Sequence, residues 1–78
     1  MTIEQLAESI EKNFEELTPG SLTGDTVLAD LIIWNSFNAL VVHVVVKEEF
    51  GVEVPWAAFR KMKTIQDLYT YIQEAKAE

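Results

Sequence analysis

The chain has 78 residues, which is enough for one domain with one modest hydrophobic core. It contains no cysteine, which excludes disulfides and thiolate metal sites, and its 13 acidic against 6 basic residues give a net charge of −7. This charge repels nucleic acid and attracts basic protein surfaces, so we expect no nucleic-acid partner. The apolar fraction of 49% is ordinary for a folded domain, so the charge does not signal disorder.

The first residues show neither a basic segment nor the apolar run that would follow it, so we expect no signal peptide. The longest apolar stretch, residues 39–46, is far shorter than the roughly 20 residues that span a bilayer. We therefore expect a monomer in the cytoplasm with no membrane span, and the lack of cysteine fits that reducing compartment.

Residues 2–17 are predicted to form an amphipathic helix, because apolar residues recur there at spacings of three and four. Thr2 and Gln5 have the pattern of a capping box at its start, and Pro19-Gly20 ends it. We interpret the glutamates of this helix as a solvated face and not as an acid–base pair: Glu4, Glu8, Glu11, Glu15 and Glu16.

Residues 18–35 are predicted to form a long connection. Its first part is polar and contains two glycines, whereas residues 27–34 are mostly apolar. A loop with so many apolar residues must pack onto something. We therefore expect it to lie across the helices and to cover the core.

The segment 36–50 gives conflicting local signals. Its five valines favour a strand by propensity. We nevertheless predict a helix, because Asn35 or Ser36 can cap its start, Lys47 falls in its last turn, and Gly51 follows as a terminating residue. A single strand would also have no partner in this chain.

Two further helices are predicted in the last third of the chain. Pro55 suits the first turn of a short helix over about residues 55–62. Thr64, with Asp67 three residues later, marks the start of a final helix over 64–76. The predicted fold class is therefore all-α: a single domain over residues 1–78, built as a four-helix bundle with a long first loop and a short third helix.

Several landmarks follow one another along the chain at characteristic spacings: Ala29-Asp30-Leu31, Trp34-Asn35-Ser36-Phe37, Glu48-Glu49-Phe50-Gly51-Val52, Val54-Pro55 and Met62-Lys63-Thr64-Ile65-Gln66-Asp67-Leu68. In this order the chain resembles the acyl carrier protein family over essentially its whole length. That family's pattern is an acidic helix, a long loop, and Asp-Ser-Leu at the start of a second helix. An acidic Glu-Glu-Phe, a hydrophobic-Pro step and a Thr-led last helix then follow.

The resemblance implies that Ser36 carries a covalent 4′-phosphopantetheine arm, transferred from coenzyme A by a phosphopantetheinyl transferase. The arm would hold an acyl group as a thioester for acyl-activating or acyl-transferring enzymes and synthases of fatty acid, polyketide or related synthesis. The start of a helix suits a phosphodiester, because free N–H groups and the helix dipole favour negative charge there. The chain itself would be no enzyme, and its sequence shows no catalytic or metal-binding motif.

Two of the departures of this chain from the family pattern bear on its function. Asn35 stands where the family has Asp, which keeps the capping ability but loses a charge that a basic transferase would recognise. The second helix is also less acidic than in the family, and one helix cannot bury so many apolar residues on one face. We therefore expect a partly apolar partner interface, and the alternative is that other elements bury this side of the second helix. The predicted interface consists of Phe37, Asn38, Leu40, Val41, Val44, Lys47, Glu48 and Trp56.

The resemblance also implies that the core doubles as an acyl pocket lined by Val42, Val46, Val54, Phe59, Met62 and Leu68. We interpret His43 as a hydrogen-bonded, partly buried residue, because the sequence offers it no second metal ligand and no catalytic partner. The two tryptophans, Trp34 and Trp56, are interpreted as packing anchors beside the arm. We interpret the basic cluster of Arg60, Lys61 and Lys63 as solvated. The alternatives are that it contacts an acidic partner or the phosphate of the arm.

Two other functions stay open at this point. An aminoacyl carrier, such as a D-alanyl carrier, is suggested by Val54-Pro55 with Phe59. A degenerate carrier fold that acts only as an unmodified interaction module is favoured by Asn35 and the apolar second helix. The identity of the loaded acid distinguishes an aminoacyl carrier from an acyl carrier. Failure of Ser36 to accept the arm distinguishes the interaction module from both carriers.

Overall fold

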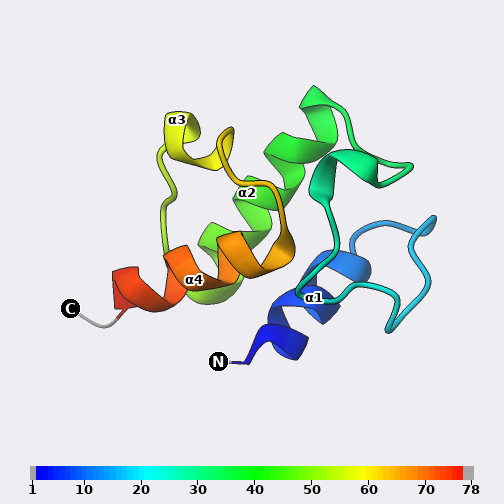
Figure 1. Cartoon of the computed structure of the whole chain (residues 1–78), viewed down its shortest axis with the longest axis horizontal. Coiled ribbons are helices and arrows are strands. Elements are labelled where there is room, and N and C mark those ends of the chain that lie inside the picture. The colour runs from blue at the N-terminus through cyan, green and yellow to red at the C-terminus, as the bar shows by residue number, and fades with distance from the viewer. Residues whose placement is uncertain (1, 77–78) are drawn as a thin grey trace.

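The structure is a computed structural model that describes residues 2–76. The described residues form four α-helices joined by irregular segments, of which the longest also contains the 3-10 turn η1 (Figure 1). Within residues 2–76 there is no β-strand beyond one isolated bridge between Val27 and Thr64. The predicted all-α fold is therefore confirmed, with these elements in chain order: α1 (Ile3–Glu11), η1 (Leu28–Asp30), α2 (Ser36–Phe50), α3 (Trp56–Phe59) and α4 (Ile65–Lys76).

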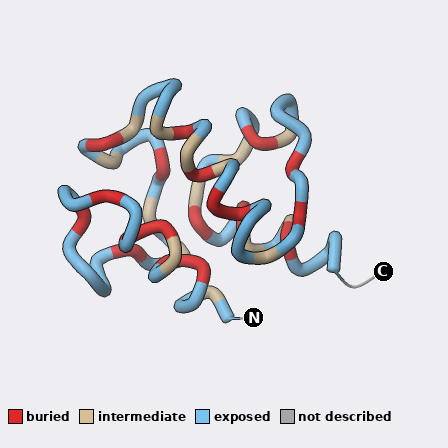
Figure 2. The backbone as a smooth tube through the Cα atoms, turned by 180° about the vertical axis from the view of Figure 1, so that it is seen from behind, coloured by how far each residue is buried: buried red, intermediate tan, exposed pale blue. Residues whose placement is uncertain are grey.

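One hydrophobic core lies where α1 packs against α2 and α4. The buried positions, red in Figure 2, recur along each of the three long helices and at points of the loops. Each large apolar side chain that is fully buried contributes about 1.5–3 kcal/mol. The largest fully buried side chains are Leu6, Ile10, Leu28, Val42, Val46, Val54, Ile65, Leu68 and Ile72.

α1 is shorter than the predicted helix over 2–17, because it ends at Glu11. The side-chain amide of Asn13 donates to the carbonyl oxygen of Ser9 at 2.7 Å, which is the acceptor that its own N–H would use in a longer helix. That N–H bonds instead to the carbonyl oxygen of Ile10 at 3.1 Å. The turns that follow still bury two side chains of the predicted apolar face, Phe14 and Leu17.

Glu11 corrects the interpretation of the α1 glutamates as a solvated face. Its side chain is buried, and its two carboxylate oxygens accept the N–H groups of Gly20 and Leu22, each at 2.9 Å. Glu11 therefore holds the first part of the long loop against the end of α1. Two of the other glutamates lie beyond the end of α1, where they are exposed: Glu15 and Glu16.

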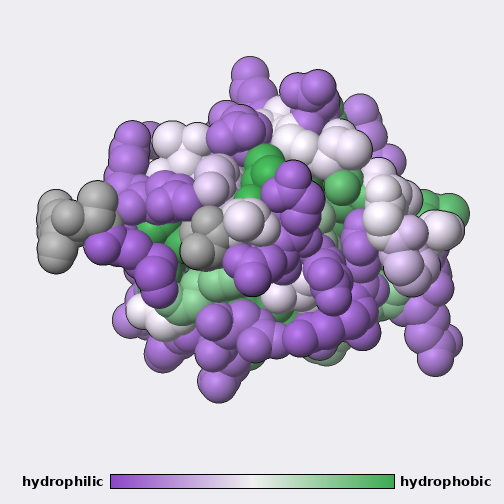
Figure 3. Space-filling view, turned by 90° about the horizontal axis from the view of Figure 1, so that it is seen from below, coloured by the Kyte–Doolittle hydropathy of each residue, from purple (hydrophilic) through white to green (hydrophobic). Residues whose placement is uncertain are grey.

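The outer surface of this end of the molecule is polar. Figure 3 views the molecule from below Figure 1, where α1 and α4 lie, and that face is largely hydrophilic with hydrophobic atoms mostly between the polar groups. The start of α1 has the predicted capping box, in which Thr2 and Gln5 exchange hydrogen bonds of 2.8 and 3.2 Å. None of the helices within residues 2–76 has the length and apolar character that a membrane crossing needs.

The second half of the long loop lies across the start of α4, as predicted. The N–H of Leu28 donates to the carbonyl oxygen of Lys63 at 2.8 Å, and the N–H of Ile65 donates to that of Thr26 at 3.1 Å. These bonds fix η1 over the core, where Leu28 is fully buried. The loop is thus a structural wall beside α2 and α4 (Figure 1).

α2 spans the predicted residues despite its valines. Val42 and Val46 are completely buried against the core, and this packing outweighs the strand propensity of the run. Gly51 ends the helix with φ at 70°, a left-handed conformation that suits glycine, and its N–H donates to the carbonyl oxygen of Lys47 at 3.0 Å. The cap predicted from the sequence at this end is therefore confirmed.

α3 is shorter than the predicted helix over 55–62, because Pro55 is its N-cap and turns replace the helix after Phe59. α4 begins one residue later than predicted, since Thr64 is its cap. The Thr64 hydroxyl accepts the N–H of Asp67 at 3.1 Å, while the Asp67 carboxylate accepts the N–H groups of Lys63 and Thr64 at 2.9 and 3.1 Å. These backbone hydrogen bonds, from Lys63 first, lower the pKa of Asp67 below its ordinary value of 3.8.

Candidate attachment serine and adjoining pocket

Ser36 is the first residue of α2, and its side chain is exposed. The cap of the helix is not Ser36 but Asn35, whose Oδ1 accepts the N–H of Asn38 at 2.8 Å. The Asn38 amide donates in turn to the carbonyl oxygen of Ile33, which fixes the chain on both sides of the serine. Within residues 2–76 the Ser36 hydroxyl makes no hydrogen bond, so it is free to react.

The backbone N–H groups around Ser36 favour an anion at this end of α2. The first N–H groups of a helix have no acceptor inside the helix, and the helix dipole adds positive potential at that end. In the described part of the chain, the N–H groups of Ser36 and Phe37 have no acceptor at all, and the first turn of α2 carries no acidic residue. A phosphate ester on the Ser36 hydroxyl would lie beside these donors.

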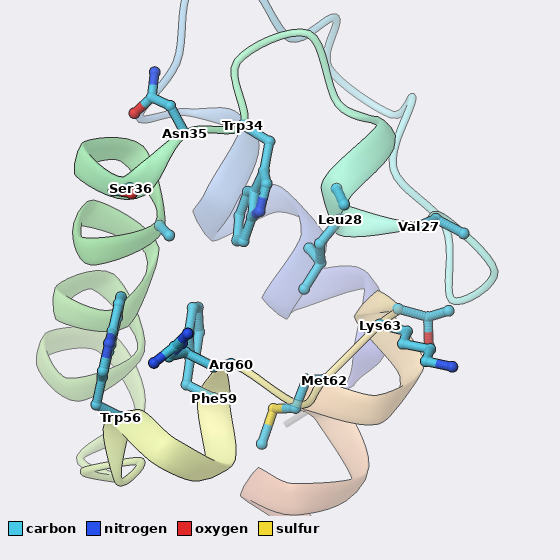
Figure 4. Close-up of a pocket in the computed structure, with 13 residues that line it drawn as sticks. Val27, Leu28, Trp34, Asn35, Ser36, Trp56, Phe59, Arg60, Met62 and Lys63 are labelled. Atoms are coloured by element: carbon cyan, nitrogen blue, oxygen red, sulfur yellow. The ribbon is translucent and has the colours of Figure 1, made fainter.

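A pocket of about 750 Å³ opens beside Ser36. Figure 4 shows its walls, which come from the long loop, the start of α2, α3 and the connection between α3 and α4. Most of its lining is apolar: Val27, Leu28, Ala29, Trp34, Ala39, Trp56, Phe59 and Met62. Its polar lining consists of Asn35, Ser36, Arg60, Lys63 and Thr64.

Three aromatic rings form one wall of this pocket. Phe59 stacks on Trp34 with centroids 6.3 Å apart and on Trp56 with centroids 5.5 Å apart, at interplanar angles of 26° and 13°. Phe59, the middle ring of the stack (Figure 4), is buried, whereas Trp34 is half-buried and Trp56 is exposed. Stacked arrangements of this kind are a preferred geometry for aromatic side chains, and they give this side of the pocket a continuous aromatic surface.

His43 lies behind the aromatic wall and not in the pocket. Its ring meets Trp56 and Phe59 edge-on, with centroids 6.0 and 5.8 Å apart. Its Nε2 lies within hydrogen-bond distance of the carbonyl oxygen of Val54, and because a carbonyl can only accept, Nε2 carries the proton. The interpretation of His43 as a hydrogen-bonded, partly buried residue is confirmed. Within residues 2–76 no group of three potential ligands could hold a metal ion.

The acyl pocket predicted in the core stays a prediction, and most of its residues do not line the pocket beside Ser36. Phe59 and Met62 line it, whereas the other four predicted residues are fully buried in the core and line no part of it: Val42, Val46, Val54 and Leu68. The long loop supplies a wall of the pocket that the sequence did not predict, and this wall includes Val27 and Leu28. The apolar half of that loop was the available signal, but its position depends on hydrogen bonds to residues more than 30 positions later.

The side chains predicted as a partner interface lie along one exposed side of α2 and on α3. Those of Phe37, Leu40, Val44 and Trp56 are 72, 50, 47 and 42% exposed, which is unusual for large apolar residues. Lys47 and Glu48 are also exposed, while two members are only half-buried: Asn38 and Val41. A second, shallower groove of about 510 Å³ continues this face, lined by Leu40, His43, Glu53, Val54, Pro55 and Trp56.

The fold and the site together define a small helical domain that presents a free serine at the start of a helix, beside an apolar pocket. No protein-family model matches the chain, and no solved structure matches it. Among curated proteins, the chain is 28% identical over 80 residues to an acyl carrier protein of Rhodococcus erythropolis, a match that covers 99% of this chain and 88% of that protein.

It is also 26% identical over 81 residues to a meromycolate extension acyl carrier protein of Mycobacterium leprae, with coverage of 100% of this chain and 70% of that protein. The chain is therefore related to the acyl carrier proteins. Both of these relatives are named as acyl carrier proteins.

Proposed function

We propose that this protein carries an acyl group as a thioester on a 4′-phosphopantetheine arm attached to Ser36, in the cytoplasm. The observation that carries the proposal is the exposed Ser36 hydroxyl, which has no hydrogen bond within the described chain because Asn35 fills the capping role. A serine at a helix start usually serves as the cap itself. Here Asn35 caps the helix instead, and the similarity to acyl carrier proteins supports attachment of the arm to the free Ser36 hydroxyl.

The residues around Ser36 fit this prosthetic group. The hydroxyl oxygen would form the phosphodiester, and the free N–H groups of Ser36 and Phe37 would lie near its negative charge at the positive end of α2. When bound, the arm supplies a terminal thiol that holds the acyl group. Trp34, Phe59 and Met62 offer apolar surface within the pocket, and this surface shields a thioester from water.

The exposed apolar side of α2 is proposed as the surface on which partner enzymes dock. From Ser36 to Val46 the helix has no charged residue, and its charges are confined to the last turn. A partner would therefore gain affinity here by burying Phe37, Leu40 and Val44, and less by pairing charges. The partners proposed are a phosphopantetheinyl transferase and the acyl-activating, acyl-transferring or synthase enzymes of fatty acid, polyketide or related synthesis.

The pocket favours an acyl group over an aminoacyl group as the cargo. Arg60 and Lys63 line it, and no acidic residue does. The free ammonium of an aminoacyl thioester would meet two like charges without a carboxylate to offset them. A neutral or anionic acyl group meets no such penalty.

A second candidate function is an interaction module that never receives the arm. The observation that favours it is the large exposed fraction of Phe37 directly after the serine, which is unusual for a site that needs only an accessible hydroxyl. Transfer of the arm distinguishes the two. The test is incubation of the pure protein with coenzyme A and a broad-specificity phosphopantetheinyl transferase, followed by the intact mass. A gain of one arm on the wild type, absent from Ser36→Ala, supports the carrier function.

A further inference from the structure

We propose that Arg60 is an anion-binding residue of the pocket beside Ser36, and that it takes an oxyanion group presented inside that pocket. Two sources carry this chemistry: the phosphate of the arm, or a carboxylate at the far end of the cargo. The choice of sources rests on the proposed function. The site itself rests on the distribution of charge in the structure.

The basic residues of the protein fall into two groups of three. In the first group Lys12 and Lys47 form ion pairs with Glu49 and Glu53 at 2.6 and 3.7 Å, and the ammonium of Lys76 donates to a backbone carbonyl oxygen at 2.9 Å. The second group lies within four positions of the chain and forms no ion pair in residues 2–76: Arg60, Lys61 and Lys63. In a protein of net charge −7, half of the cations are thus gathered, without ion-pair partners, next to one pocket.

Arg60 is the cation of this group that is placed to meet a ligand. Figure 4 shows its guanidinium beside the ring of Phe59, on the Trp56 side of the pocket, whereas Lys63 lies at the opposite edge near Val27. The charge of Lys63 also contributes to the lowered pKa of Asp67, so it is partly compensated. The Arg60 guanidinium has no hydrogen bond within the described chain, and no acidic residue lines the pocket.

The chemistry of the guanidinium points to an oxyanion. Its planar fork of N–H donors matches the two oxygens of a carboxylate or phosphate, and such charge-assisted pairs are about twice as strong as neutral hydrogen bonds. A cargo with a neutral end would leave this charge unmatched, whereas an acyl group that ends in a carboxylate would pair with it.

The site can be tested on the unmodified full chain by titration with free probes while its amide resonances are followed by NMR. Two matched pairs of probes separate charge from shape: 4′-phosphopantetheine against pantetheine, and glutarate against glutaramide. Three proteins are compared: wild type, Arg60→Gln and Lys61→Gln. Lys61 is the matched control, because it is an exposed neighbour with the same charge that does not line the pocket.

We expect an anionic probe to shift the resonances of pocket residues saturably, and its neutral counterpart to shift them far less. Arg60→Gln should lower the affinity for the anionic probe at least about fivefold, whereas Lys61→Gln should change this affinity by less than about twofold. Saturation by 4′-phosphopantetheine alone assigns the site to the phosphate of the arm, and saturation by glutarate alone assigns it to a cargo carboxylate. Saturation by both assigns it to either oxyanion.

The proposal is overturned if neither anionic probe saturates, or if the two variants weaken binding equally, since that result would describe a diffuse basic surface. Arg60 is exposed, and an unchanged thermal unfolding midpoint of Arg60→Gln confirms that the variant is folded. Because the test uses the unmodified chain, its result does not depend on arm transfer. A failure of this site and a failure of Ser36 to accept the arm are therefore separate observations.

Discussion

The Oδ1 atom of Asn35 accepts the N–H of Asn38 at 2.8 Å, and this bond decides what the serine between them can do. With the first turn of α2 capped by the asparagine, the hydroxyl of Ser36 has no structural task within the described chain. One side chain thus stabilises the helix and its neighbour stays available for chemistry.

Replacement of Asn35 separates its capping role from its missing charge. Asn35→Ala is expected to lower the free energy of unfolding by about 0.5–2 kcal/mol, because the N–H of Asn38 loses its acceptor. Asn35→Asp keeps the acceptor and adds a negative charge at the positive end of α2, which should raise stability by about 0.3–1 kcal/mol. Urea denaturation measures both. An Asn35→Ala variant as stable as the wild type would contradict the capping role.

Glu11→Gln is expected to lower the free energy of unfolding by about 1–3 kcal/mol. The carboxylate accepts two backbone N–H groups with two oxygens, whereas an amide has only one oxygen and sets its NH₂ group against the other donor. The matched control is Glu8→Gln on the same helix, which removes the same charge from an exposed side chain and should change stability by less than about 0.5 kcal/mol. Equal effects of the two variants would contradict the anchoring role of Glu11.

Asp67 should make stability depend on pH in the acid range. Its pKa in the folded protein lies below 3.8 because the N–H groups of Lys63 and Thr64 stabilise the carboxylate. A lowered folded pKa stabilises the protein fully above the ordinary value, and this contribution disappears as the pH falls through the folded value.

The test compares urea midpoints of the wild type and Asp67→Asn from pH 7 down to pH 2, a range that brackets the ordinary carboxyl pKa of about 4. The wild type should be the more stable protein at neutral pH, and the difference should shrink below pH 3.8. A difference that stays constant over the whole range would show that the carboxylate is not responsible.

A charge on the exposed side of α2 should impair partner enzymes without unfolding the protein. Leu40→Glu and Val44→Glu each place a carboxylate on a side chain that is about half exposed. We expect each to lower kcat/KM of a partner enzyme at least about tenfold, because the charge must be desolvated in the complex. Ala75→Glu, on an exposed position of α4, is the control for added charge. If all three variants behave alike, the α2 face is not the docking surface.

The elements that the sequence predicts well are those specified by neighbouring residues. The caps at Thr2, Asn35, Gly51 and Thr64 depend on hydrogen bonds to residues three or four positions away, and all four are present. Such short-range patterns can be recognised without knowledge of the fold. They are sufficient to define the bounds of α2 in spite of its valines.

The features that the sequence does not reveal depend on distant residues or on competition between two local hydrogen bonds. Glu11 looks like any other surface glutamate until the loop brings Gly20 and Leu22 to it. Asn13 ends α1 because its side chain competes successfully for a carbonyl oxygen, which a periodic apolar pattern does not indicate. The pocket beside Ser36 depends on the loop lying over α4, so its walls are not evident from neighbouring residues in the sequence.

The proposed function depends on acceptance of the arm by Ser36, which the intact mass after transfer reports. The wild type, Ser36→Ala and a standard acyl carrier protein are each incubated with coenzyme A and a broad-specificity phosphopantetheinyl transferase. We expect one added phosphopantetheine on the wild type and none on Ser36→Ala, although the variant keeps the other serines, Ser9 and Ser21. An unmodified wild type beside a fully loaded standard carrier would overturn the proposed carrier function in favour of the interaction module.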